Sequence, residues 1–106
     1  MKKLIGTTIK VAMAVTLLAA GGQVMAAGDA AAGKAKAVTC AGCHGAAGIS
    51  PNDLWPNLAG QKATYLTKQI KAFRDGVRND PMMSSMVKTL SDQDAENLAA
   101  YYAEMK

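Results

Sequence analysis

The two cysteines and the one histidine of this 106-residue chain stand together in a single run, Cys40-Ala41-Gly42-Cys43-His44. Two thiols three positions apart lie about one helical turn from each other, and an imidazole follows directly. No thiol or imidazole elsewhere in the chain can join them as a further ligand. Any group that these side chains bind is therefore bound at one place, and the rest of a small chain must fold around it.

Cys-x-x-Cys-His is the attachment signature of c-type haem. Thiols with this spacing can reach the two vinyl groups along one porphyrin edge, and the adjacent imidazole then comes under the iron. We therefore predict one covalently attached haem c, with Cys40 and Cys43 as thioether residues and His44 as an iron ligand. A structural zinc site would need about four ligands, and the chain has no second cysteine or histidine pair to complete one. A thioredoxin-like dithiol would accompany a βαβ pattern, and the chain shows no strand pattern. A plain disulfide would leave His44 without a role.

The chain beyond residue 26 is poor in side chains that can fill a core. Of its 80 residues 37 are apolar, but 16 of these are alanine and only 16 are Val, Ile, Leu, Met, Phe or Trp. Domains of this size commonly need a disulfide, a metal or a cofactor, and alanine leaves much of a core unfilled. This composition predicts that something other than side chains occupies the centre.

Residues 1–26 have the pattern of a secretory signal peptide, and residues 27–106 form the predicted haem domain. A basic start, Met1-Lys2-Lys3, precedes an apolar stretch. Small residues then follow at the positions that a signal peptidase reads, up to Ala26. Lys10 leaves too few uninterrupted apolar residues to span a bilayer comfortably. We therefore expect cleavage after Ala26, a periplasmic location and no stable membrane insertion.

The predicted domain carries nine basic and eight acidic side chains, a net charge of +1. A nucleic-acid binder would keep a strong basic excess, so we expect no nucleic-acid partner. Six lysines admit two interpretations, a basic rim that steers an acidic partner or a solvated surface of mixed charge. They are Lys34, Lys36, Lys62, Lys68, Lys71 and Lys88.

The fold is predicted to be all-α, with a few short helices wrapped around one haem. Only nine Val, Ile or Thr occur in the 80 residues, and they never alternate as in a strand. Helices are expected over 29–38, with Asp29 at its start, over 62–74, which carries an apolar stripe, and from Ser91 onward. Irregular structure is expected over 45–60 and 77–84, which hold all three prolines.

The second face of the iron needs a ligand, and methionine sulfur is the candidate because no second histidine exists. The predicted domain has Met82, Met83, Met86 and Met105. Met82 and Met83 follow Asn79-Asp80-Pro81, on an expected loop between two helices. A methionine there could approach the iron from the side opposite His44, although any single methionine can equally fill a core gap. The residues alone do not choose between Met82 and Met83.

The predicted domain resembles class I cytochromes c, in particular small bacterial cytochromes of the c-553 kind and one half of the di-haem cytochromes c4. The matching residues are Ala27-Gly28-Asp29, Cys40 to His44, Tyr65-Leu66, Gln69, Phe73-Arg74, Gly76, Arg78, Asn79-Asp80, Met82-Met83, Leu90-Ser91-Asp92, Asp94 and Leu98 to Tyr102. The resemblance implies that Met83 is the axial methionine, with Met82 as runner-up and Met86 as packing. It also implies that the Pro56 carbonyl accepts the proton of His44 Nδ1. Trp55 and Tyr65 are expected to pack on the porphyrin or to hydrogen-bond a propionate, although ordinary core aromatics would look the same.

Two strong axial ligands would leave no open position on the iron, which favours electron transfer over catalysis. We therefore expect a one-electron carrier, not an enzyme, that exchanges electrons through an exposed haem edge. Its expected partners are respiratory complexes or periplasmic dehydrogenases and oxidases, and we expect a monomer. The alternative is a peroxidase or gas sensor in which the methionine ligand is displaceable.

Overall fold

The computed structural model describes residue 6 and residues 28–106, so the predicted signal peptide lies almost wholly outside the described residues. The described part is helical and contains no strand, which confirms the prediction of an all-α fold. None of its helices has the length and apolar character needed to cross a membrane. The elements are α1 (Ala30–Lys36), a 3-10 helix η1 (Ala37–Thr39), α2 (Ala41–His44), α3 (Ala63–Arg74), α4 (Pro81–Val87) and α5 (Asp92–Ala103).

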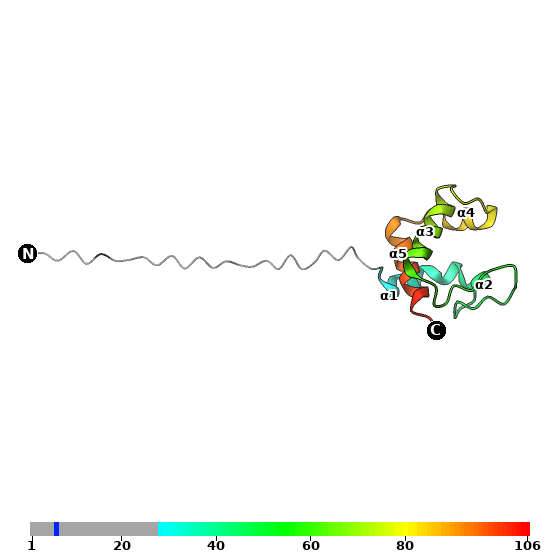
Figure 1. Cartoon of the computed structure of the whole chain (residues 1–106), viewed down its shortest axis with the longest axis horizontal. Coiled ribbons are helices and arrows are strands. Elements are labelled where there is room, and N and C mark those ends of the chain that lie inside the picture. Colours follow the sequence, from blue (N-terminus) through cyan, green and yellow to red (C-terminus); the bar gives the residue numbers. More distant parts are fainter. Residues whose placement is uncertain (1–5, 7–27) are drawn as a thin grey trace, which may run out of the picture.

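The first and last helices, α1 and α5, cross in close contact (Figure 1). The Asp29 carboxylate accepts hydrogen bonds from the backbone N–H groups of Ala31 and Ala32 and so caps α1. The Asp29 N–H in turn donates to the side chain of Asn97 in α5, over 2.8 Å. Gly33 is buried where a β-carbon would collide with the Asn97 carbonyl, so glycine is what lets the two backbones meet.

Helix α3 packs on α5 and completes a small apolar core. The stripe predicted along 62–74 is present, because Leu66 and Phe73 of α3 are buried. Ser91 and Asp94 form a capping box at the predicted start of α5. The buried core cluster consists of Ala37, Leu66, Leu98, Ala99 and Tyr102.

The expectation of irregular structure over 77–84 holds for residues 77–80 and is wrong for residues 81–84, because α4 begins at Pro81. The Asp80 carboxylate caps this helix by accepting hydrogen bonds from the N–H groups of Met82 and Met83. Proline is well suited to the first position of a helix, where its missing N–H has no intrahelical partner to lose. Met82 and Met83 therefore lie in the first turn of a helix and not on a loop.

The connection between α3 and α4 begins where the sequence predicted a helix end. Gly76 adopts φ +76°, a left-handed conformation that favours glycine. The N–H groups of Val77 and Arg78 then fold back onto the Ala72 carbonyl, each over 3.0 Å. This turn directs the chain toward α4.

Candidate haem-binding site

Cys43 and His44 lie on the one-turn helix α2, and Cys40 is its N-cap residue, directly after η1. The N–H groups of Cys43 and His44 donate to the Cys40 carbonyl over 3.2 and 3.0 Å, which fixes the turn. Both thiols are half-buried and free in the structure. One helical turn thus carries all three predicted attachment residues. Sequence reasoning missed this helix, because four residues are too few to show a periodic pattern.

The His44 ring is buried, with 5% of its surface exposed, and its orientation is fixed. Its Nδ1 lies 2.8 Å from the carbonyl oxygen of Pro56, which is the contact that the resemblance implied. A carbonyl can only accept, so Nδ1 carries the proton and Nε2 presents its lone pair. Among the described residues Nε2 has no hydrogen-bond partner and is not sealed from solvent. The His44 imidazole therefore has a fixed orientation and a free lone pair on Nε2 with which it can bind a metal.

Two residues that sequence reasoning missed hold the Pro56 loop against α2. The Ser50 hydroxyl donates to the Cys43 carbonyl over 3.1 Å. The Ser50 N–H donates to the Asn57 side chain over 2.6 Å, next to Pro56. No periodic or motif signal marks this pair in the sequence, because the contact depends on how an irregular loop closes.

The environment of Cys40 disfavours thiol redox chemistry. Burial raises the pKa of the Cys40 thiol above its ordinary value, although hydrogen bonds with Thr39 and Tyr102 oppose this shift. The thiolate is the reactive form in thiol–disulfide exchange, so a raised pKa slows it. Burial likewise raises the pKa of the Tyr102 hydroxyl. A half-buried thiol with a raised pKa is less readily ionised than an exposed one.

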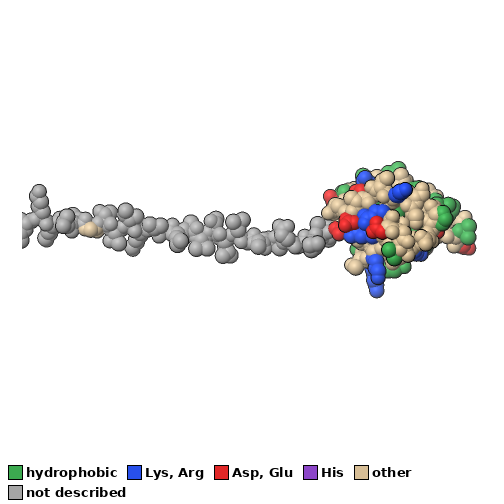
Figure 2. Space-filling model, turned by 90° about the horizontal axis from the view of Figure 1, so that it is seen from above, with side chains coloured by type: hydrophobic (Ala, Val, Ile, Leu, Met, Phe, Trp, Pro, Cys, Tyr) green, Lys and Arg blue, Asp and Glu red, His purple; other side chains and the backbone are tan. Residues whose placement is uncertain are grey.

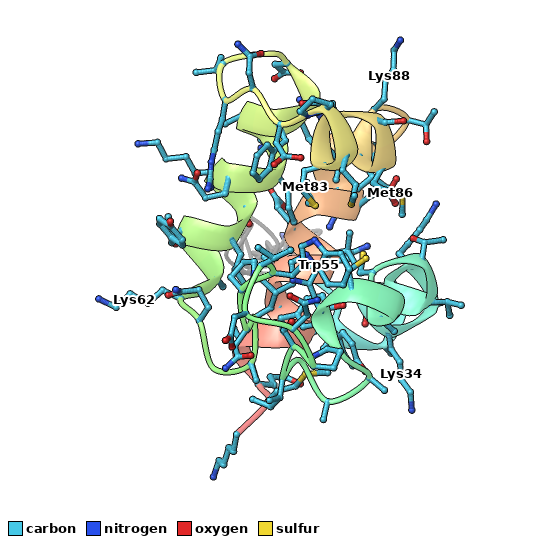
Figure 3. All side chains as sticks on the ribbon, turned by 90° about the vertical axis from the view of Figure 1, so that its right-hand side faces the viewer. Lys34, Trp55, Lys62, Met83, Met86 and Lys88 are labelled. Carbon is cyan, nitrogen blue, oxygen red and sulfur yellow. The ribbon has the colours of Figure 1, made fainter. Side chains whose placement is uncertain are left out.

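The four candidate methionines occupy different environments. Met105 packs on the core cluster, and Met82 and Met86 are 53% and 46% exposed. Met83 is half-buried, and its side chain points from α4 toward the middle of the face shown in Figure 3. We call this face, which carries Trp55, Met83 and Met86, the front face.

The predicted aromatic residues differ in their placement. Trp55 is half-buried and lies in the middle of the front face, below Met83 (Figure 3). Tyr65 lies on α3 and is 48% exposed, so it is not part of the buried core. The structure thus brings Trp55 to the front face, where α4 lies above it, and leaves Tyr65 at the surface.

The described residues fit a c-type haem in donor chemistry and in packing. Two free thiols and a buried imidazole with an available Nε2 lie on adjoining positions of one turn. Leu98 is the only large side chain of the described part with less than 2% of its surface exposed. Large apolar residues instead remain open to solvent, among them Val38, Ile49, Leu54, Met82 and Met86. A porphyrin would supply the apolar volume that these side chains lack.

Helices that cross in this way around a Cys-x-x-Cys-His turn define the class I c-type cytochromes. The sequence model of the Cytochrome c family matches residues 30–106, and the chain belongs to this family. Its cofactor is accordingly covalently bound haem c.

Three similar proteins support this assignment. Cytochrome c4 of Pseudomonas aeruginosa is 51% identical over 85 residues, which cover 80% of this chain and 42% of that protein. Cytochrome c-554(548) of Halomonas halodenitrificans is 49% identical over 83 residues, which cover 76% of this chain and all of that protein. The crystal structure of reduced cytochrome c4 from Pseudomonas stutzeri matches with a TM-score of 0.66 and 34% identity, over 73% of this chain and 48% of that one. The chain thus spans about half the length, or less, of the cytochromes c4 that it matches.

Proposed function

We propose that this protein is a periplasmic carrier of single electrons that holds one haem c. Cys40 and Cys43 would attach the haem, and His44 and Met83 would be the protein ligands of its iron. The observation that carries this proposal is the His44 ring, whose Nδ1 is held by Pro56 while Nε2 stays available. When bound, the haem iron supplies the one-electron couple between the ferric and ferrous states.

The residues of the site would act by positioning and by excluding water. The hydrogen bond from His44 Nδ1 to Pro56 fixes the ring plane and raises the donor strength of Nε2. The Asp80 carboxylate, 2.9 Å from the Met83 N–H, fixes the first turn of α4 and with it the start of the Met83 side chain. A thioether ligand raises the reduction potential relative to a second histidine. Trp55 would shield the haem from water on the front face.

With His44 and Met83 both bound as strong ligands, the iron would keep no open position for a substrate. The proposed activity is therefore outer-sphere electron transfer through an exposed haem edge. Little structural change accompanies such transfer when both oxidation states keep the same ligands. A peroxidase or a gas sensor would instead require that Met83 leave the iron readily.

The proposed location rests on the signal-peptide pattern of residues 1–26, and the proposed partners are proteins of the same compartment. A similar protein of Thiomonas intermedia, 43% identical over 77 residues, is named a thiosulfate dehydrogenase electron acceptor. By analogy, we propose a periplasmic dehydrogenase as electron donor.

The lysines around the front face would support brief docking. Figure 3 shows Lys34, Lys62 and Lys88 at the periphery, pointing away from Trp55 and Met83. Two further lysines are paired with carboxylates, Lys36 with Asp94 and Lys71 with Asp92. Figure 2 likewise shows basic and acidic side chains adjoining on the face seen from above. A rim that is only partly basic favours weak contacts with modest salt dependence.

The first prediction concerns the methionine ligand. We expect Met83→Ala to abolish the weak near-infrared-edge absorption band of methionine-bound ferric haem and to lower the reduction potential. The matched variants Met82→Ala and Met86→Ala should keep both properties, because these side chains are exposed on the same helix. Loss of the band in Met82→Ala alone would show that the ligand is Met82.

The same proteins separate the carrier from the alternative function. Wild-type protein in its ferrous form should not take up carbon monoxide rapidly at neutral pH, whereas Met83→Ala should bind it readily. Rapid, tight uptake by the wild-type protein would contradict the carrier and favour the peroxidase or gas sensor.

A further inference from the structure

The segment that carries Met83 is held to the rest of the protein by few buried side chains. We define the methionine segment as residues 75–90, which connect α3 to α5 and include α4. Val87 is its only buried residue, with Met83, Ser84 and Leu90 half-buried. Few apolar contacts therefore restrain this segment, so the polar contacts at its ends contribute more to its position.

The side chain of Arg78 fastens the first arm of the methionine segment to α3. Its Nη1 donates to the Gln69 side chain over 2.9 Å. Its guanidinium carbon lies 4.4 Å from the centre of the buried Phe73 ring, a cation–π contact. These contacts come from one face of α3, so they fix the direction in which the chain approaches α4.

The side chain of Arg74, the last residue of α3, fastens the far end of the methionine segment to α3 through one guanidinium. Its Nε and Nη2 donate to the carboxylate of Asp75, the first residue of the segment, over 2.8 and 3.1 Å. Its Nη1 donates to the carbonyl of Leu90, the last residue, over 3.2 Å, and to Asp92 over 2.8 Å. The paired carboxylates raise the pKa of Arg74, which therefore keeps its charge across the working pH range. Only 19% of this side chain is exposed.

We propose that Arg74 and Arg78 are positioning residues that hold Met83 on the haem iron by clamping the methionine segment to α3. This inference rests on the proposed function, in which Met83 is an iron ligand. An external ligand can replace Met83 only when the segment moves away. The apparent affinity for such a ligand therefore reports how often the segment opens. The exchange breaks an iron–sulfur bond and forms an iron–nitrogen bond, with no net transfer of electrons.

The test is an imidazole titration of the ferric holoprotein, followed through loss of the methionine band. Arg74→Gln and Arg78→Gln should each tighten the apparent affinity for imidazole about tenfold, the effect expected when charge-assisted hydrogen bonds are lost from the closed form. Arg74→Lys should give a smaller change, because an ammonium keeps the charge and can reach Leu90 or Asp92 but cannot form all the hydrogen bonds of the guanidinium at once.

Two control variants separate positioning from general destabilisation and from charge. Asp29→Ala removes the cap of α1, away from the methionine segment, and should lower the urea midpoint without changing the imidazole affinity. Lys68→Gln removes a positive charge from α3 and should also leave the affinity unchanged.

The experiment distinguishes failure of the proposed clamp from failure of the proposed Met83 ligand. If both arginine variants bind imidazole no more tightly than Asp29→Ala does, while wild-type protein shows the methionine band, the clamp is refuted and Met83 stays the proposed ligand. If Met83→Ala keeps the band, the ligand assignment fails and the clamp fails with it. Should one arginine variant not accumulate as holoprotein, the other and Arg74→Lys still decide the outcome.

Discussion

At the scale of single residues, Gly33 shows how one missing side chain sets the packing of two helices. Glycine lowers the helix propensity of α1 by about 1 kcal/mol relative to alanine. Its cost is offset by the contact that it permits, since a β-carbon at this position would collide with the Asn97 carbonyl in α5. The close crossing of the two backbones thus explains why a glycine lies inside α1.

We predict that Gly33→Ala lowers the free energy of unfolding by about 1–3 kcal/mol, because overpacking forces α1 away from α5. Lys34→Ala, at the next and exposed position of the same helix, should change it by less than about 0.5 kcal/mol. Urea unfolding of the two holoproteins measures both values. A stabilised Gly33→Ala protein would show that helix propensity outweighs the steric contact.

The site residues that could be predicted are those that a local motif brings together. Cys40, Cys43 and His44 adjoin in sequence, so their common site needed no knowledge of the fold. The partner of His44, the Pro56 carbonyl, came only from the resemblance to a family. Ser50 and Asn57 carry no such signal, because an irregular loop brings them to α2.

At the scale of helices, the predictions succeeded where a long apolar stripe and a cap coincide. Helix α3 and the start of α5 at its Ser91 cap were predicted on these grounds. Helix α2 is one turn long, and α4 is only seven residues long and begins at a proline that suggested a loop. In α4 the cap residue Asp80 and Pro81 at the first position are both signals of a helix start. The small and sulfur-containing residues that follow them show no clear apolar stripe, so the helix was not predicted.

The capping box of α5 makes stability depend on pH. The backbone N–H of Ser91 and then its hydroxyl hold the pKa of Asp94 below its ordinary value, although desolvation opposes them. A carboxylate with a lowered pKa in the folded state stabilises the protein above its unfolded pKa, about 3.9. This stabilisation is lost as the pH falls through the folded pKa.

We therefore predict that Asp94→Asn lowers the free energy of unfolding at pH 7 by about 0.3–1 kcal/mol, the range for a charge at a helix N-terminus. The difference from wild-type protein should shrink as the pH falls below about 3.9. Urea unfolding at a series of pH values tests this. Asp53→Asn is the matched control, because this exposed carboxylate has no hydrogen bond or ion pair among the residues that the structure describes. An Asp94→Asn difference that is independent of pH would contradict the mechanism.

At the scale of the whole molecule, the cofactor replaces much of the core that the sequence lacks. The chain is rich in alanine beyond residue 26, and the core cluster has only Leu66, Leu98 and Tyr102 as large side chains. Leu54 and Val38 are 82% and 74% exposed. A haem tethered by two thioethers stays with the chain even when the fold opens, so it stabilises the helices that pack around it.

The most direct test of this account is the intact mass of the purified protein, combined with its reduced-minus-oxidised spectrum in denaturing pyridine. We predict one haem per chain, retained after denaturation and attached at Cys40 and Cys43, whereas a chain with Cys40→Ala and Cys43→Ala should carry no covalent haem and be largely unfolded. A colourless wild-type protein with both thiols unmodified, folded and melting cooperatively, would contradict the account.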